Sequence, residues 1–288
     1  KLVCKKDDDK SIVYALLMVG GLQKNLADYA GVESSMTEAL KVVKDSTYYP
    51  YIYNLLGIAY KEQYDYDLAL LYYTKSLKII GDDCTRALIK NNIALLSEQK
   101  EDFPEAIRIL EPLTKIDALR KNRLGYAKVV DNLGYSYYKN NDSRGLENLQ
   151  LSLAIRDSLG DDYERVPSLL HLAEFYQKSD PKLALDYSLK GYKAATAVNS
   201  PDDRLLSLDF IIKNSSGDAD KKYYLIHSSL SDSITKVRKI AKNQFAKIKY
   251  DSKKITIEYE KNQNSKIALF IVLLALIAAF IIYYFIAN

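Results

Sequence analysis

Large and small side chains alternate at fixed offsets in the segment from Tyr53 to Ser76. The first half reads Tyr53-x-x-Leu56-Gly57-x-x-Tyr60, and the second half reads Ala69-x-x-x-Tyr73-x-x-Ser76. Spacings of three and four residues place these side chains on one face of each of two helices. Small residues at Gly57 and Ala69 allow the helices to cross closely, while the larger side chains fill the space beside the crossing. The pattern predicts a pair of antiparallel helices.

The same pattern recurs along the chain at a nearly constant step. The small residue of the first helix falls at Gly20, Gly57, Ala94, Gly134 and Ala173, in steps of 37, 37, 40 and 39 residues. The small residue of the second helix falls at Ala69, Ala106, Gly145 and Ala184, and the first pair has Val32 at this position. A constant step of this kind is typical of a solenoid. Over residues 11–200 the chain resembles tetratricopeptide-repeat proteins, whose usual step is ~34 residues. The expected fold is therefore an all-α solenoid of about five helical hairpins.

The chain outside the repeats divides by composition. Residues 1–10 form a charged segment, and residues 201–218 are predicted to be a degenerate repeat that completes a capping hairpin. Residues 219–266 contain no proline or glycine, which predicts one long basic helix. Residues 267–286 follow as twenty residues without a charge. At ~1.5 Å per residue such a helix spans ~30 Å, so we predict that it crosses a lipid bilayer.

The location of the array is ambiguous in the sequence. Between Lys236 and Lys266 there are ten basic and three acidic residues, which by the positive-inside tendency favours a cytoplasmic, tail-anchored array. Cys4 is followed by an acidic run and resembles the acylated cysteine at the start of a mature bacterial lipoprotein, which favours export. The alternative is an incidental cysteine in a charged terminus. Our prediction is a single-pass membrane protein with a periplasmic array.

A second resemblance favours export. Repeats, a basic helix and a single membrane helix resemble the front half of bacterial sensor histidine kinases with tetratricopeptide sensor regions. The resemblance implies a signalling protein whose kinase is absent from this chain. Two alternatives stay open: the sensor region of a membrane-bound DNA-binding regulator, and a tail-anchored scaffold with no signalling output. Isoleucine or alanine at seven-residue steps from Ile234 to Ile255 also admits a homodimer through the basic helix, although other seam positions are polar.

The composition offers little catalytic chemistry. The chain has two histidines, His171 and His227, two distant cysteines, and no glycine-rich phosphate loop. We therefore expect no enzyme activity, no cofactor and no metal from this chain. The formal net charge of +4 is too small to favour nucleic acid as a partner.

Function is expected to lie in binding a protein or peptide. The register of the repeats places Asn54, Asn91 and Asp131 at one equivalent position on the concave side. Side-chain amides stacked in this way can hold the backbone of an extended peptide. Lys61, Tyr135 and Tyr138 lie on the same side, where the tyrosines can pack against peptide side chains. The alternative is that all six belong to solvated helix faces.

Overall fold

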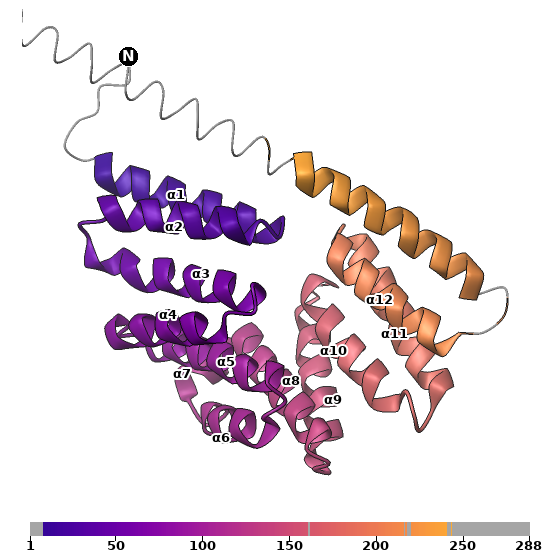
Figure 1. Ribbon diagram of the computed structural model, residues 1–288. Coiled ribbons are helices and arrows are strands. Elements are labelled where there is room, and N and C mark those ends of the chain that lie inside the picture. Colours follow the sequence, from indigo (N-terminus) through magenta and orange to yellow (C-terminus); the bar gives the residue numbers. More distant parts are fainter. Residues whose placement is uncertain (1–7, 161, 216, 218–219, 241–242, 244–288) are drawn as a thin grey trace, which may run out of the picture. The chain divides into compact units, whose positions relative to one another are not determined.

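A computed structural model describes residues 8–160, 162–215, 217, 220–240 and 243. The chain divides into two compact parts, Lys1–Arg238 and Lys239–Asn288, and nearly all described residues belong to the first part. Their regular secondary structure is helical throughout. The helices, labelled in Figure 1, are α1 (Asp8–Asn25), α2 (Tyr29–Val42), the 3-10 turn η1 (Ser46–Tyr48), α3 (Tyr49–Glu62), α4 (Tyr66–Ile79), α5 (Asp83–Gln99), α6 (Phe103–Leu113), α7 (Asp117–Lys121), α8 (Arg123–Lys139), α9 (Arg144–Leu159), α10 (Asp162–Tyr176), α11 (Pro181–Ala197) and α12 (Pro201–Asn214).

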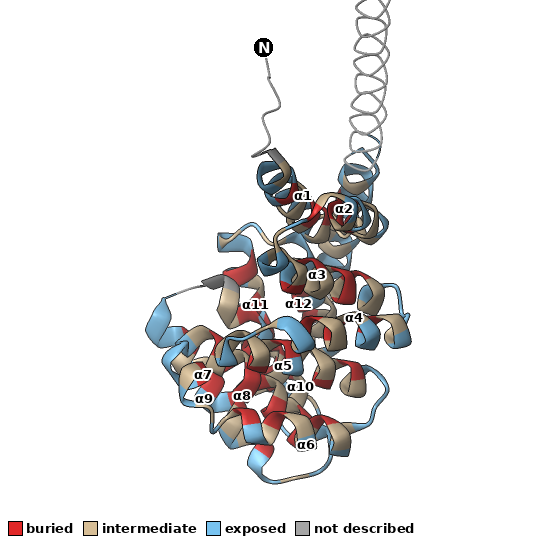
Figure 2. Ribbon diagram, turned by 90° about the vertical axis from the view of Figure 1, so that its left-hand side faces the viewer, coloured by how far each residue is buried: buried red, intermediate tan, exposed pale blue. Residues whose placement is uncertain are grey.

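Five helical hairpins stack in chain order, as the sequence predicts. They pair α1 with α2, α3 with α4, α5 with α6, α8 with α9, and α10 with α11. Buried residues lie where the helices face one another (Figure 2). The small residues lie at the crossings: a Cβ added to Gly57 would lie 2.5 Å from the Tyr73 ring, and one added to Gly134 would lie 2.8 Å from the backbone nitrogen of Leu149. The tetratricopeptide-like arrangement is therefore confirmed by the packing.

The turn inside each of the first four hairpins is built in the same way. A residue in the left-handed region, with φ between 54° and 64°, precedes an aspartate; these residues are Ala27, Tyr64, Glu101 and Asn141. In the first three turns the aspartate carboxylate accepts a hydrogen bond from a backbone N–H in the first turn of the second helix. This is a side-chain N-cap, and it fixes where the second helix begins. In the first hairpin, for example, α2 begins at Tyr29 because Asp28 caps it.

The third hairpin is followed by an additional short helix. Its second helix, α6, ends at Leu113, one residue after Pro112, because proline cannot continue the helical hydrogen bonds. The short helix α7 follows and packs against both α5 and α8, with Leu119 fully buried. This additional helix lies within the 40-residue step between Ala94 and Gly134.

The predicted capping segment, residues 201–218, supplies the first helix of a sixth hairpin, α12. Helix α12 packs on α11 and α10, and a further helix over residues 220–240 is paired with it. Two side-chain contacts connect these last two helices in antiparallel order. His227 Nε2 lies 3.2 Å from Asp209 Oδ1, and Arg238 Nη2 lies 2.6 Å from Asp202 Oδ1. The first part of the predicted basic helix therefore belongs to the array.

The predicted membrane location is corrected by the structure. Among the helices that the structure describes, none is long and apolar enough to cross a membrane. The predicted span over residues 267–286 lies outside the described residues, as do Cys4 and residues 244–266 of the predicted basic helix. The function proposed below does not depend on a membrane anchor.

Candidate functional site

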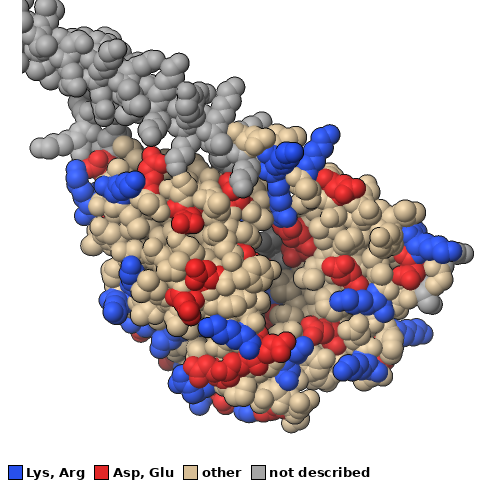
Figure 3. Space-filling model, in the orientation of Figure 1, with Lys and Arg blue, Asp and Glu red and all other residues tan. Residues whose placement is uncertain are grey.

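The first helices of the hairpins form a continuous inner layer. Helix α3 contacts α5, α5 contacts α8, α8 contacts α10, and α10 contacts α12. A curved stack is tightest on its concave side, so these helices line the inner wall. The surface is hollowed between the first two hairpins and the last two, and acidic and basic side chains are interspersed around the hollow (Figure 3).

Polar side chains connect neighbouring first helices by one repeated contact. Asn92 Nδ2 donates to Asn54 Oδ1 at 3.1 Å, and Asn132 Nδ2 donates to Asn91 Oδ1 at 2.8 Å. At the next interface His171 Nδ1 lies 2.9 Å from Asp131 Oδ2. In each case the residue three before the small crossing residue contacts the residue two before it in the next hairpin. We call these three contacts the interhairpin ladder.

The ladder includes three of the predicted site residues and gives them a structural task. Asn91 is 5% exposed and Asp131 is 1% exposed, whereas Asn54 is half-buried. Their side-chain oxygens already accept hydrogen bonds or ion pairs from the next hairpin. The predicted register is therefore present, while a role for these three residues in holding a peptide backbone stays a prediction.

The third ladder contact belongs to a buried ionic cluster. Ser168 Oγ donates to Asp131 Oδ1 at 2.6 Å, and Arg156 Nη1 donates to Ser168 Oγ at 2.9 Å and lies 3.5 Å from Asp131 Oδ2. Arg156 is 2% exposed, and Ser168 is fully buried. We call Asp131, Arg156, Ser168 and His171 the ionic cluster. It connects α8, α9 and α10 and thus holds the fifth hairpin against the fourth.

The charges of the cluster support one another. Burial alone would raise the pKa of Asp131, but the charges of His171 and Arg156, with hydrogen bonds from His171 and Ser168, hold that pKa below its usual value. Burial would lower the pKa of His171, but the carboxylates of Asp131, Glu98 and Glu174 raise it above its usual value. Both shifts favour the charged forms that make the contact.

Glu98, on α5, faces this cluster from the neighbouring hairpin. Ser136 Oγ donates to Glu98 Oε1 at 2.6 Å. Burial is the largest influence and raises the pKa of Glu98 to about 7; the hydrogen bond from Ser136 and the charges of His171 and Lys61 oppose it, and Asp131 adds to it. Glu98 therefore changes charge near neutral pH, in contrast to an ordinary glutamate.

Aromatic side chains cover the ionic cluster on the inner side. The Tyr135 ring stacks on His171 with centroids 4.4 Å apart, and the Tyr138 ring lies 5.0 Å from Phe175. Tyr138 Oη donates to the backbone oxygen of Glu174 at 3.3 Å. We call Tyr135, Tyr138, His171 and Phe175 the aromatic wall; all four are partly exposed. The structure therefore brings the predicted Tyr135 and Tyr138 together at one place.

Lys61, the remaining predicted site residue, lies on the inner wall of the second hairpin. Its ammonium group is 2.7 Å from Glu62 Oε1, and its charge influences Glu98. The corresponding position in the fourth hairpin is Tyr138, because both follow the crossing glycine by four residues. Lys61 is thus in register with the aromatic wall but two hairpins away from it.

The ionic cluster lacks the arrangement of a nucleophilic catalytic site. The Ser168 hydroxyl donates to the carboxylate of Asp131 and not to the imidazole, and it is fully buried. An activated serine needs its hydroxyl hydrogen-bonded to a base and open to the substrate. The cluster is therefore a structural connection between hairpins.

Sequence reasoning missed the partners of the ladder and of the cluster. Asn92, Asn132 and His171 were not predicted to face the preceding hairpin, and Arg156 lies on a second helix that the concave-side argument did not include. The adjacent asparagines Asn91-Asn92, repeated as Asp131-Asn132 one hairpin later, carried a usable signal. Two polar residues in succession at a position that is otherwise packed indicate contacts to both neighbouring hairpins.

Comparison with known proteins gives no closer assignment. No known family's sequence profile matches the chain, and no curated protein matches it in sequence. Among solved structures, PilF of Pseudomonas aeruginosa is similar at 15% identity, over 75% of this chain and 98% of that one, with a TM-score of 0.49. BtubC from P. vanneervenii is similar at 12% identity, over 81% of this chain and 92% of that one, also with a TM-score of 0.49. The fold assignment therefore rests on the helix packing described above.

Proposed function

We propose that the array is a protein-interaction module that binds a peptide segment along its inner wall, chiefly at the aromatic wall. The observation that carries the proposal is the fixed presentation of partly exposed rings. Tyr135 is held by its stack on His171, and Tyr138 by Phe175 and by the backbone of Glu174. Rings that are already ordered lose little conformational entropy on binding, so they favour affinity. Tyrosine is also among the residues that most often dominate binding interfaces.

The charged groups beside the rings define what a ligand meets there. Lys139 Nζ lies 3.2 Å from Glu174 Oε1 and 5.7 Å from the Tyr135 ring centroid. One cation and one carboxylate thus flank the rings, and both can hydrogen-bond a peptide backbone or a polar side chain. The wall suits a segment with apolar side chains and interspersed polar groups.

Selection and mutation test this proposal. A displayed library of linear peptides is selected on the immobilised chain, and the dissociation constant of the best binder is measured by fluorescence polarisation. Tyr138→Ala should weaken binding by about 10–100-fold, the loss expected for a tyrosine that dominates an interface. Tyr64→Asn is the matched control, since Tyr64 lies in a turn and asparagine tolerates its left-handed backbone. Circular dichroism melting checks that both variants fold.

Two results would contradict the proposal. The first is a selection that yields no binder; the second is a binder whose affinity is unchanged by both Tyr138→Ala and Tyr135→Ala. The finer prediction, that the array is the sensor region of a signalling protein, rests on repeats followed by a long helix and stays a prediction.

A further inference from the structure

One ladder contact differs from the others in that it can titrate. The contacts Asn54–Asn92 and Asn91–Asn132 join two amides, which keep the same charge at every physiological pH. The equivalent contact between the fourth and fifth hairpins joins a carboxylate to an imidazole, Asp131 to His171, and Glu98 approaches the same place from the third hairpin. The side chain of His171 is 25% exposed, so solvent protons reach it. We propose that this contact is a proton-operated joint: as the pH falls, His171 takes up a proton and is held against Asp131, which joins the fifth hairpin to the fourth, while Glu98 titrates beside it.

The charged groups that face the joint come from five helices. His171 on α10 meets Asp131 from α8, Glu98 from α5 and Glu174 from its own helix. Glu98 meets Lys61 from α3, Asp131 from α8 and His171 from α10. Arg156 from α9 completes the set through Asp131. With Glu98 ionised, three carboxylates face one imidazole, and the cations beside these carboxylates are Lys61, Arg156 and Lys139, which lies 3.2 Å from Glu174.

The sign of the effect follows from which state binds protons more tightly. In the folded array the pKa values of both Glu98 and His171 lie above their ordinary values. The closed joint therefore holds protons that the opened joint releases, and closure is favoured by acidification. For Glu98 the window runs from its ordinary value of about 4.3 up to about 7, and for His171 it begins at about 6.5 and extends upward. Below these pH windows the closed joint gains no further stability as the pH falls. At still lower pH, protonation of Asp131 weakens the contact.

The same joint also positions the aromatic wall. His171 holds Tyr135 in place through the ring stack. Glu174 and Phe175, one turn further along α10, hold Tyr138. When α10 moves away from α8, these ring pairs are separated, because each consists of one ring from each helix. Control of ligand binding by pH follows from this coupling and rests on the proposed function, whereas the joint itself does not.

Hydrogen–deuterium exchange of the full chain, without any ligand, tests the joint. Protection factors, corrected for intrinsic exchange rates, are measured for peptides of α10 and of α3 at several values between about pH 5.5 and about pH 8. A difference of one bound proton between closed and opened states changes the opening constant up to about tenfold per pH unit. We expect protection of α10 to fall with rising pH by about this factor, while protection of α3, which carries an amide contact, stays level.

Two substitutions separate the contributions of the two groups. Glu98→Gln keeps an acceptor for Ser136 and should remove the pH dependence below about pH 7. His171→Asn places at this position the residue type that the preceding interface uses, and it should remove the dependence above about pH 6.5. Level protection of α10 in the wild-type chain would overturn the proposal, as would an unchanged slope in both variants. Because no ligand is present, neither result depends on whether the inner wall binds peptide.

Discussion

The two ends of the interhairpin ladder use the same positions with different chemistry. Between the second, third and fourth hairpins the contact is a single hydrogen bond between two amides. Between the fourth and fifth hairpins it is an ion pair within a buried cluster of four side chains. Burying a charge costs more free energy than burying an amide, so a buried charge needs more partners. Equal position in a repeat therefore implies equal geometry but not equal energy or equal dependence on conditions.

The largest expected effect comes from removing the charge at the centre of the cluster. Asp131→Ala leaves Arg156 and His171 buried without their carboxylate, so it should lower the free energy of unfolding by about 3–5 kcal/mol. Urea denaturation followed by circular dichroism measures this change. Because His171 can lose its proton and thereby soften the loss, the measurement is made at about pH 6, where the imidazole is charged. A loss below about 1 kcal/mol would show that the cluster is no stronger than an amide contact.

A smaller loss is expected at the amide contacts. Asn91→Ala removes the acceptor of the Asn132 side chain at a buried position, and it should cost about 1–2 kcal/mol. Asn54→Ala makes the equivalent change at a half-buried position, where water can replace the lost partner, and it should cost less. The same urea titration compares both. If Asn54→Ala costs more than Asn91→Ala, burial does not set the strength of the ladder.

The turns offer a comparison in which stability should rise. Tyr64 is held at φ 64°, so its backbone is strained, and its side chain is 78% exposed and therefore not packed in the core. Tyr64→Gly should stabilise the chain by about 1 kcal/mol, because glycine adopts the left-handed region without steric cost. Asn141→Gly is the matched control and should gain less, since asparagine already tolerates this region. Equal or opposite shifts of the urea midpoint would contradict the explanation.

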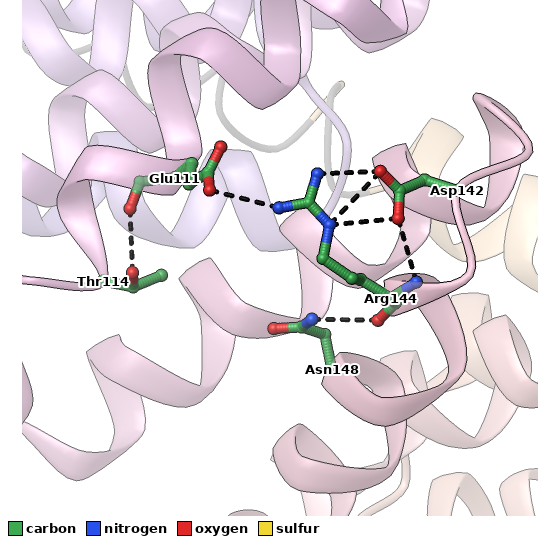
Figure 4. Close-up of polar contacts among 5 residues, drawn as sticks. All are labelled: Glu111, Thr114, Asp142, Arg144 and Asn148. Atoms are coloured by element: carbon green, nitrogen blue, oxygen red, sulfur yellow. Dashed lines mark hydrogen bonds and ion pairs between the residues drawn. The ribbon is translucent and has the colours of Figure 1, made fainter.

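The smallest effect is expected at an exposed contact between second helices. Arg144 Nη1 lies 3.2 Å from Glu111 Oε1, and Arg144 is also bound by Asp142, so it keeps a partner when Glu111 is lost (Figure 4). Exposed ion pairs contribute little because water screens them. Glu111→Ala should leave the urea midpoint unchanged within error. A clear shift would mean that contacts between second helices, as well as those of the inner wall, hold the hairpins together.

The periodic pattern of the sequence predicts most of the fold but only part of the candidate site. Small residues such as Gly57 and Gly134 predict helix crossings because a Cβ there meets the opposite helix. The inner position of Asn54, Asn91 and Asp131 follows from the same register. Their partners do not, because the one-residue offset between neighbouring first helices reflects how the hairpins are rotated against each other. A sequence period gives the length of a repeat but not that rotation. Arg156 joins the cluster from a second helix, which the concave-side argument did not include.

The extra helix α7 shows what sets the spacing between neighbouring hairpins. Five residues of helix are added behind the third hairpin, yet Asn91 and Asn132 meet across that junction with the same offset as Asn54 and Asn92. Contacts between the first helices thus set the spacing along the inner wall. The number of residues that connect one hairpin to the next on the outer side can vary. A foreign loop grafted between Thr114 and Asp117 should alter the outer contour and leave the inner spacing intact.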